Sequence, residues 1–167
     1  MSPIRPDLVE CLVFRVTDAG RVEQLLIRRA DHRIFPGIWQ PVTGGIEPGE
    51  RVPLAALREV EEETGLGVAD IEAFYDLDQV GSFFDEDRDE IVNSVIFALR
   101  VRPQAKPAVS GEHVDLLWCE RTEAERLSVW PPYRDSYELV ERLAADPELA
   151  RWFGLDPAGR RLARPPR

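Results

Sequence analysis

The segment 43–66 reads TGGIEPGERVPLAALREVEEETGL, and it decides how the rest of the chain is interpreted. Its apolar residues recur at helical spacing, which predicts an amphipathic helix from Pro53 to Thr64. Pro53 suits the first turn, where its missing N–H costs nothing, and Gly65 suits the left-handed residue just past the helix end. This helix carries four glutamates within five positions, although like charges at such close spacing destabilise a helix.

The glutamates divide between two sides of this helix. At ~100° per residue, the core-facing stripe consists of Leu54, Leu57, Val60 and Thr64. Glu59, Glu62 and Glu63 fall together on the opposite side, whereas Glu61 points elsewhere. A solvated acidic face would carry interspersed basic residues, but only Arg58 is available here. Carboxylates on one face, next to a glycine-rich turn that offers carbonyl oxygens, are the hard ligands that Mg²⁺ or Mn²⁺ require. The pattern therefore predicts a divalent-metal site.

The composition fits one domain with its own hydrophobic core. The chain has 167 residues, of which 44% are hydrophobic, and its formal net charge is −10. Such an acidic chain argues against a nucleic-acid binder, and no apolar run is long enough to span a membrane. The first residues lack the apolar stretch of a signal peptide, so we expect a cytoplasmic protein. Cys11 and Cys119 stand among aliphatic residues and are expected to be buried thiols.

The flanking segments predict further strands and helices. Runs with strand-like composition occupy residues 7–16, 22–30, 39–45, 68–80, 90–101 and 113–120. Two later segments, 121–130 and 133–147, have helical spacing. Residues 81–90 indicate an exposed acidic turn. We therefore expect one α/β domain over residues 1–153, followed by a flexible basic tail, rich in proline and arginine, over residues 154–167.

The glutamate helix and the turn before it resemble the signature of a known family. Gly44, five residues, Glu50, seven residues and then REVEEETGL at 58–66 match the Nudix box, G-x5-E-x7-R-E-U-x-E-E-x-G-U, at every defined position, where U is aliphatic. The chain is thus identified as a member of the Nudix hydrolase family. The resemblance covers most of residues 7–145. It implies an α/β/α sandwich with a central mixed sheet, in which the box helix carries the metal site.

The resemblance also implies roles for single residues. The expected ligands of Mg²⁺ or Mn²⁺ are Glu59, Glu62, Glu63 and the backbone carbonyl of Thr43 or Gly44. Arg58 would orient a glutamate, Glu50 would pair with Arg58 or reach a metal through water, and Gly65 would end the helix. Glu112, just ahead of a strand, would join the metal ligands. Water attacks phosphorus in this family, and a carboxylate removes its proton, so the candidate catalytic residues are Glu62, Arg58 and Glu112.

A weaker resemblance concerns the substrate. The segment WQPVTGG at 39–45, together with Asn93, the pair Glu112–His113 and Trp130, is similar to the dihydroneopterin triphosphate pyrophosphohydrolase branch. The substrate-binding residues it implies are Arg28, Arg29, Trp39, Gln40, Thr43 and Gly45. Phe35 or Trp39 could stack on the substrate's ring, although an aromatic side chain beside a strand is more often core.

We therefore expect hydrolysis of a nucleoside- or pterin-triphosphate type of small molecule, with release of pyrophosphate. Substrates of other Nudix branches are the alternatives: ADP-ribose, nucleotide sugars and dinucleoside polyphosphates. A non-catalytic, ligand-sensing Nudix-like domain usually lacks box carboxylates, which are intact here. An isomerase of the same fold would need a reactive cysteine ahead of the box, and Cys11 lies too early and in too apolar a run. Family members often form homodimers, although nothing in this sequence requires one.

Overall fold

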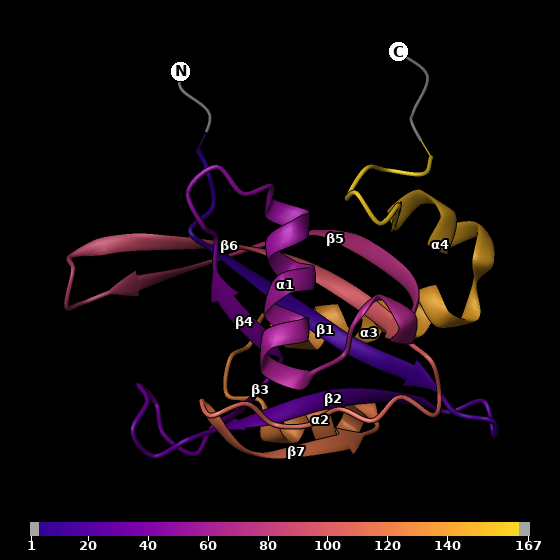
Figure 1. The fold of residues 1–167 in the computed structure, drawn as a ribbon, viewed down its shortest axis with the longest axis horizontal. Coiled ribbons are helices and arrows are strands. Elements are labelled where there is room, and N and C mark those ends of the chain that lie inside the picture. Colours follow the sequence, from indigo (N-terminus) through magenta and orange to yellow (C-terminus); the bar gives the residue numbers. More distant parts are fainter. Residues whose placement is uncertain (1–3, 164–167) are drawn as a thin grey trace.

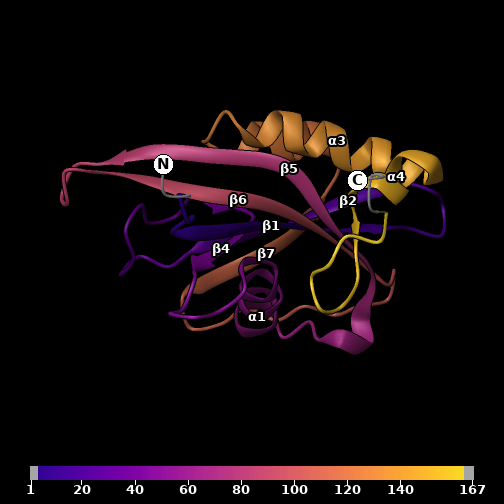
Figure 2. The ribbon, with the colours of Figure 1, turned by 90° about the horizontal axis from the view of Figure 1, so that it is seen from above.

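A mixed sheet of eight strands runs through the protein, and helices cover both of its faces (Figures 1 and 2). The computed structural model describes residues 4–163. The strands are β1 (Leu8–Val16), β2 (Val22–Arg29), β3 (Trp39–Gln40), β4 (Val42–Gly45), β5 (Ile71–Asp85), β6 (Glu90–Val101), β7 (His113–Cys119) and β8 (Gly154–Leu155). The helices are α1 (Val52–Thr64), the 3₁₀ turn Val68–Asp70, α2 (Arg121–Leu127), α3 (Tyr133–Ala145) and α4 (Pro147–Phe153). This is the α/β/α sandwich that the sequence predicted.

The centre of the sheet is β1, which divides one of its edges between two partners. Its second half pairs with β2, with Phe14 opposite Gln24, and its first half pairs with β4, with Val9 opposite Gly44. Along its other edge, β1 pairs in parallel with β6. Past its pairing with β1, β2 pairs with β3 along the same edge. Along its other edge, β2 pairs with β7. The short strand β4, which carries Gly44 and Gly45, therefore lies in a fork of the sheet beside α1 (Figure 1).

Two apolar cores lie on opposite faces of this sheet. Alternate residues of β1 serve the two cores: Val9, Cys11 and Val13 pack in the layer of α1, whereas Leu12 and Phe14 pack in the layer of α2 and α3. Both faces are buried, which explains why the strand sequences read as continuous apolar runs. Cys11 and Cys119 are buried free thiols, as expected. Between residues 4 and 163, no helix is long and apolar enough to cross a membrane.

The hairpin of β5 and β6 extends beyond the rest of the sheet as a long arm (Figure 1). We expected residues 81–90 to form an exposed acidic turn, and this was largely wrong. Strand β5 continues to Asp85, and its pairing with β6 runs without interruption from Gln79 to a final pair, Asp85 with Glu90. The aromatic residues Phe83 and Phe84 favour strand, and this preference prevails over the acidic residues that follow them.

The C-terminal segment also differs from the expected flexible tail. Residues 154–163 follow α4 and pack against the domain, where β8 pairs with Phe74 and Tyr75 of β5. The Arg161 guanidinium contacts a carboxylate oxygen of Asp76 at 2.8 Å. The guanidinium of Arg51 donates hydrogen bonds to the carbonyls of Ala158 and Gly159. Residues 164–167 of the expected tail lie outside the described residues.

Candidate active site

The guanidinium of Arg58 lies at the centre of the acidic face of α1. Its Nε and Nη2 donate to the two carboxylate oxygens of Glu50 at 2.8 and 3.0 Å, and Nη2 also donates to the carbonyl of Gly45 at 2.8 Å. Its Nη1 donates to Glu59 at 2.7 Å and to Glu62 at 3.2 Å. These bonds hold the pKa of Glu50 below its ordinary value. One arginine therefore offsets the repulsion among three of the carboxylates.

Glu59 packs against the backbone of Gly44. A methyl group built on Gly44 would lie 1.9 Å from the carboxyl carbon of Glu59, so only glycine leaves room for this side chain. Burial raises the pKa of Glu59, Arg58 lowers it, and the charges of Glu62 and Glu112 raise it further. The box glycine and the box glutamate thus fit together as one close contact between β4 and α1.

Glu63 is the buried member of the group, with a residue exposure of 7%. Its Oε2 has no hydrogen-bond partner among the described residues. Burial, and then the charges of Glu59 and Glu112, raise the pKa of Glu63 to about 8, while the backbone of Thr43 and the charge of Arg29 act in the opposite direction. An unpartnered buried carboxylate oxygen is costly unless a ligand satisfies it.

The segment after β6 brings Glu112 to these carboxylates. The N–H groups of Ala108 and Ser110 donate to the last carbonyls of α1, those of Thr64 and Glu63. This contact caps the helix and leads the chain past its C-terminal end before β7 begins. The carboxylate of Glu112, half-exposed, pairs with Arg33 at 3.0 Å. Glu59, Glu62, Glu63 and Glu112 are called the carboxylate cluster below.

Hard divalent cations prefer oxygen ligands, and the carboxylate cluster offers carboxylate oxygens beside the backbone carbonyls of β4. The unpartnered Oε2 of Glu63 is the observation that favours this use. Within residues 4–163, however, no three acidic, histidine or cysteine side chains lie close enough together to hold an ion. Instead, Glu59 and Glu62 bind Arg58, and Glu112 binds Arg33.

The structure separates the expected substrate-binding residues onto two faces of the sheet. Arg29 lies on the α1 side, where its charge acts on Glu63 and His113. Gln40 is on the same side, since it pairs with Ile27 of the α1-side core. Three expected residues instead lie toward the opposite layer: Arg28, Trp39 and Thr43. Trp39 packs in the α2–α3 core, Arg28 pairs with it across the strands, and Thr43 pairs with Glu10 beside buried Tyr133. Because side chains alternate along a strand, adjacent residues cannot share one face.

Two buried polar side chains near the cluster, His113 and Gln40, each have an atom with no hydrogen-bond partner among the described residues. His113 is 4% exposed, its Nδ1 lies 3.4 Å from the Ser110 hydroxyl, and its Nε2 has no partner among the described residues. The amide nitrogen of Gln40 is likewise buried and unpartnered. Burial, and then the charge of Arg29, lower the pKa of His113. The ion pair of Arg33 with Glu112 had no local signal, because the two residues lie far apart along the chain.

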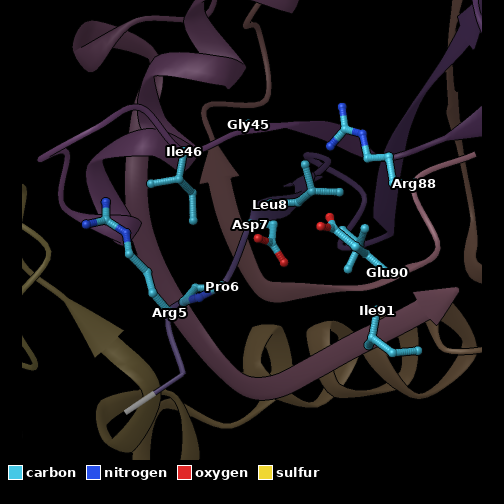
Figure 3. A pocket seen from close by; sticks show the side chains of 10 residues that line it. Arg5, Pro6, Asp7, Leu8, Gly45, Ile46, Arg88, Glu90 and Ile91 are labelled. Atoms are coloured by element: carbon cyan, nitrogen blue, oxygen red, sulfur yellow. The ribbon is translucent and has the colours of Figure 1, made fainter. Parts of the chain in front are cut away.

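A hollow of about 510 Å³ lies beside the box loop, between the N-terminal segment and the arm of β5 and β6 (Figure 3). Figure 3 shows Arg5 and Ile46 on one side, Arg88 on the other, and Asp7 and Glu90 between them. The guanidinium of Arg5 donates to the carbonyls of two loop residues of the box, at 3.3 and 2.6 Å. Gly45 is the only expected site residue that lines this hollow. Arg5 therefore supports the loop, and the hollow lies to one side of the carboxylate cluster.

The family follows from a match over most of the chain. A family model described as NUDIX domain matches residues 8–140. The chain belongs to the Nudix hydrolase family. Nudix hydrolases act on small phosphate compounds and generally use divalent metals. In this Nudix hydrolase, the matched residues include the fork of the sheet, the box helix and the segment that carries Glu112.

Two curated relatives match this chain over part of their length. The nucleoside triphosphatase NudI of Salmonella schwarzengrund is 36% identical over 104 residues, which are 59% of this chain and 74% of NudI. An octanoyltransferase of Myxococcus xanthus is 37% identical over 124 residues, which are 72% of this chain but only 32% of that protein. The match therefore covers about three-quarters of NudI and about a third of the octanoyltransferase.

Solved structures agree on the fold. The Ap4A hydrolase of C. elegans, in a binary complex, superposes with a TM-score of 0.70 at 21% identity, covering 84% of this chain and 98% of that one. The dihydroneopterin triphosphate pyrophosphohydrolase of E. coli superposes with a TM-score of 0.60 at 24% identity, covering 78% and 92%. At these identities, the two structures show that this Nudix hydrolase shares their fold, and they do not select a substrate.

Proposed function

We propose that this Nudix hydrolase cleaves a phosphoanhydride bond in a nucleoside- or pterin-triphosphate type of small molecule and releases pyrophosphate. The observation that carries the proposal is the carboxylate cluster around Glu63, a buried acid whose Oε2 has no partner among residues 4–163. The similarity to NudI, whose name is nucleoside triphosphatase, favours a triphosphate over the other substrate classes of the family.

The proposed cofactor is Mg²⁺ or Mn²⁺. The four members of the carboxylate cluster and the backbone carbonyl of Gly44 would hold it. When bound, such an ion neutralises phosphate oxygens and lowers the pKa of a coordinated water. Gly44 supports this assignment, because its lack of a side chain lets Glu59 lie directly against the β4 backbone.

The residues around the cluster have distinct proposed tasks. Arg58 keeps Glu50, Glu59 and the carbonyl of Gly45 in fixed positions through its hydrogen bonds. Glu62 and Glu112 are the exposed members of the cluster, so either can accept the proton of the attacking water. The positive charge of Arg29 acts on buried Glu63 and lowers its pKa, and its guanidinium is suited to a phosphate oxygen.

The other expected residues would contact the substrate from the two sides of the sheet. Gln40 and the backbone of Gly45 are proposed to contact the phosphates from the α1 side of the sheet. Arg28, Trp39 and Thr43 would contact a part of the substrate that reaches the opposite side. The cytoplasmic location and the homodimer stay predictions.

Product analysis tests the proposal. The purified protein would be incubated with Mg²⁺ and a panel that contains canonical and oxidised nucleoside triphosphates, dihydroneopterin triphosphate, ADP-ribose and diadenosine polyphosphates. We expect pyrophosphate from a triphosphate, at a rate well above that of the other classes. Preferred cleavage of ADP-ribose or of a dinucleotide would contradict the proposed substrate. Binding without turnover of any compound would support a ligand-sensing domain instead.

Matched variants test the site in the same assay. Glu63→Gln and Glu62→Gln remove one cluster carboxylate each, whereas Glu61→Gln removes the exposed neighbour that points away from the cluster. We expect the first two to lose most of the turnover and the third to keep it. Wild-type turnover in a folded Glu63→Gln variant would show that the cluster does not perform the reaction.

A further inference from the structure

The arm formed by β5 and β6 has an outer edge that no strand covers. Near its start, β5 pairs with β8 at Phe74 and Tyr75, and its register with β6 shifts between Asp76 and Gln79. From Gln79 to Asp85, β5 pairs with β6 alone within the described part of the chain. The outer part of the arm extends beyond the helices (Figures 1 and 2). The backbone groups on this edge of β5 are therefore available to another strand.

The composition of this edge does not discourage pairing. Edge strands are usually protected by lysine, by proline or by a bulge. Between Gln79 and Asp85 there is no basic residue and no proline, and the register with β6 does not shift. Val80, Phe83 and Phe84 are instead 70%, 49% and 59% exposed. Large apolar side chains on an uncovered strand edge indicate a surface that another strand covers.

Apolar residues form two short rows across the face of the arm that lies toward α1. Phe84 is directly opposite Ile91 of β6, and Val80 is directly opposite Val95. Val95 packs against the α1-side core, whereas Ile91 is 60% exposed. Because side chains alternate along a strand, Val80 and Phe84 share this face and Phe83 lies on the other. Both rows end at the uncovered edge of β5.

The uncovered segment is symmetric about Ser82, which is its midpoint. If the same segment of a second copy paired with it antiparallel, around a two-fold axis at Ser82, Val80 of each copy would lie opposite Phe84 of the other. Directly opposite residues in an antiparallel pair share a face, and pairs of an aromatic with a β-branched residue are favourable. Each apolar row would then continue across four strands, from Ile91 and Phe84 of one copy to Val80 and Val95 of the other.

The same register suits the other face of the arm and its ends. Phe83 of one copy would lie opposite Gly81 of the other, where the absence of a side chain leaves room for the ring. The turn 86–89 of one copy would lie beside Asp78 of the other. Arg88 is the basic residue of that turn, and the side chains of Arg88 and Asp78 are 72% and 81% exposed. An ion pair between them would form twice in a symmetric dimer.

We propose that the segment Gln79–Asp85 is the interface of a symmetric homodimer, in which β5 of one copy pairs antiparallel with β5 of the other about Ser82. The two sheets thereby join into one. A second copy is the partner that fits, because the segment is complementary to itself in both its apolar rows and its charged ends. The interface contains no member of the carboxylate cluster, so it forms whether or not the proposed function is correct.

Sedimentation equilibrium over a range of protein concentrations tests this interface. Val80→Lys places a charge in the middle of an apolar row, and Val80 is exposed in the single chain, so the variant should fold. Val114→Lys is the matched control, since Val114 is 55% exposed but lies in β7, away from the arm (Figure 1). Thermal melts of the three proteins would check that each one is folded.

We expect wild type and Val114→Lys to approach twice the mass of one chain as the concentration rises. The dissociation constant of Val80→Lys should be higher by about 10-fold or more. A wild type that stays monomeric at every concentration would overturn the proposal. It would also be overturned by a dimer that Val80→Lys leaves intact, or by one that Val114→Lys weakens to the same extent.

A cysteine at the two-fold axis tests the register directly. Opposite Cα atoms in an antiparallel pair are about 4.5–5.5 Å apart, which a disulfide can bridge. Ser82→Cys should therefore form a disulfide-linked dimer when oxidised glutathione is added, seen on a non-reducing gel. Phe83→Cys, which would face Gly81 of the second copy, should form little. The native thiols, Cys11 and Cys119, are buried. Equal cross-linking of the two variants, or none in Ser82→Cys, would overturn the proposed pairing.

Discussion

The carboxyl group of Glu59 occupies the space that a side chain at Gly44 would need, with a separation of 1.9 Å between its carboxyl carbon and a methyl group placed there. The nearest atoms include both carboxylate oxygens. The two residues come from different elements, β4 and α1, so the contact sets how closely the box helix approaches β4. The sequence pattern pairs these residues at a fixed spacing, and the structure supplies the reason.

Gly44→Ala should therefore displace Glu59 without removing any carboxylate. We expect kcat for the triphosphate to fall about 10²-fold, because a displacement of about 1 Å in a positioned group has that order of effect. Gly111→Ala is the control, since a methyl group at Gly111 meets nothing within 4 Å. Equal activity of the two variants would contradict the importance of this contact.

Arg58→Lys should weaken both the fold and the site. Lysine keeps the positive charge but cannot bond Glu50 with two nitrogens while also reaching Glu59 and the carbonyl of Gly45. We expect the free energy of unfolding to fall by about 1–3 kcal/mol. Urea denaturation measures it. Arg126→Lys, at an exposed pair with Glu123, is the control, and a loss of similar size there would show that any arginine pair has this effect.

Glu63 predicts a specific dependence of stability on pH in metal-free protein. Its pKa is raised from an ordinary 4.5 to about 8, so the folded protein keeps a proton that the unfolded chain has already lost. Stability therefore falls as the pH rises from about 4.5 through about 8, and a neutral glutamine avoids this loss. In the presence of a chelator, Glu63→Gln should melt above the wild type at about pH 9, with little difference at about pH 4.

Thermal melts of wild type, Glu63→Gln and Glu61→Gln across this range would measure the effect. Glu61 is exposed, so its variant should follow the wild type at every pH. A gap between Glu63→Gln and wild type that stayed constant with pH would show that Glu63 ionises normally in the folded protein.

Arg161→Ala tests whether the C-terminal segment stabilises the domain. Its guanidinium bonds Asp76 of β5 at 2.8 Å and the carbonyl of Trp152 of α4 at 3.1 Å. Arg161 therefore connects the C-terminal segment to two other elements. We expect a loss of about 1 kcal/mol, which lowers the melting temperature by about 2–4 °C. Arg160→Ala, one residue away and exposed, should leave the melting temperature unchanged. Identical melts for both variants would contradict a stabilising role.

The sequence predicted those parts of the fold that depend on local spacing. The box helix was expected from Pro53 to Thr64, and α1 runs from Val52 to Thr64. Gly65 has the expected left-handed conformation, with a φ of 70°. The core-facing stripe is also confirmed at Val60 and Thr64, which are buried. These features follow from 3.6-residue periodicity and from glycine chemistry, which a single segment contains in full.

Other features depend on distant partners and were not visible in the sequence. Ala55, on the glutamate side of α1, is completely buried, because β4 covers that side of the helix. From the sequence, Arg28 and Arg29 were equivalent candidates for binding the substrate. The pairing of β2 with its neighbours shows that their side chains lie on opposite faces of the sheet. The docking of residues 154–163 depends on Asp76 and Arg51, which lie far away along the chain. A composition rich in proline and arginine gives no sign of such partners.

The pairing of the first strands with late ones has a consequence for the order in which this chain folds. During synthesis, β1 and β2 emerge first, but their partners β6 and β7 end only at Val101 and Cys119. The last carbonyls of the box helix likewise gain their hydrogen-bond donors only after Ala108 and Ser110 have been synthesised. Such long-range pairings form slowly, because a long loop must close before they contribute. A ribosome-bound chain that stops before β7 therefore contains the whole Nudix box but neither a complete sheet nor an assembled site.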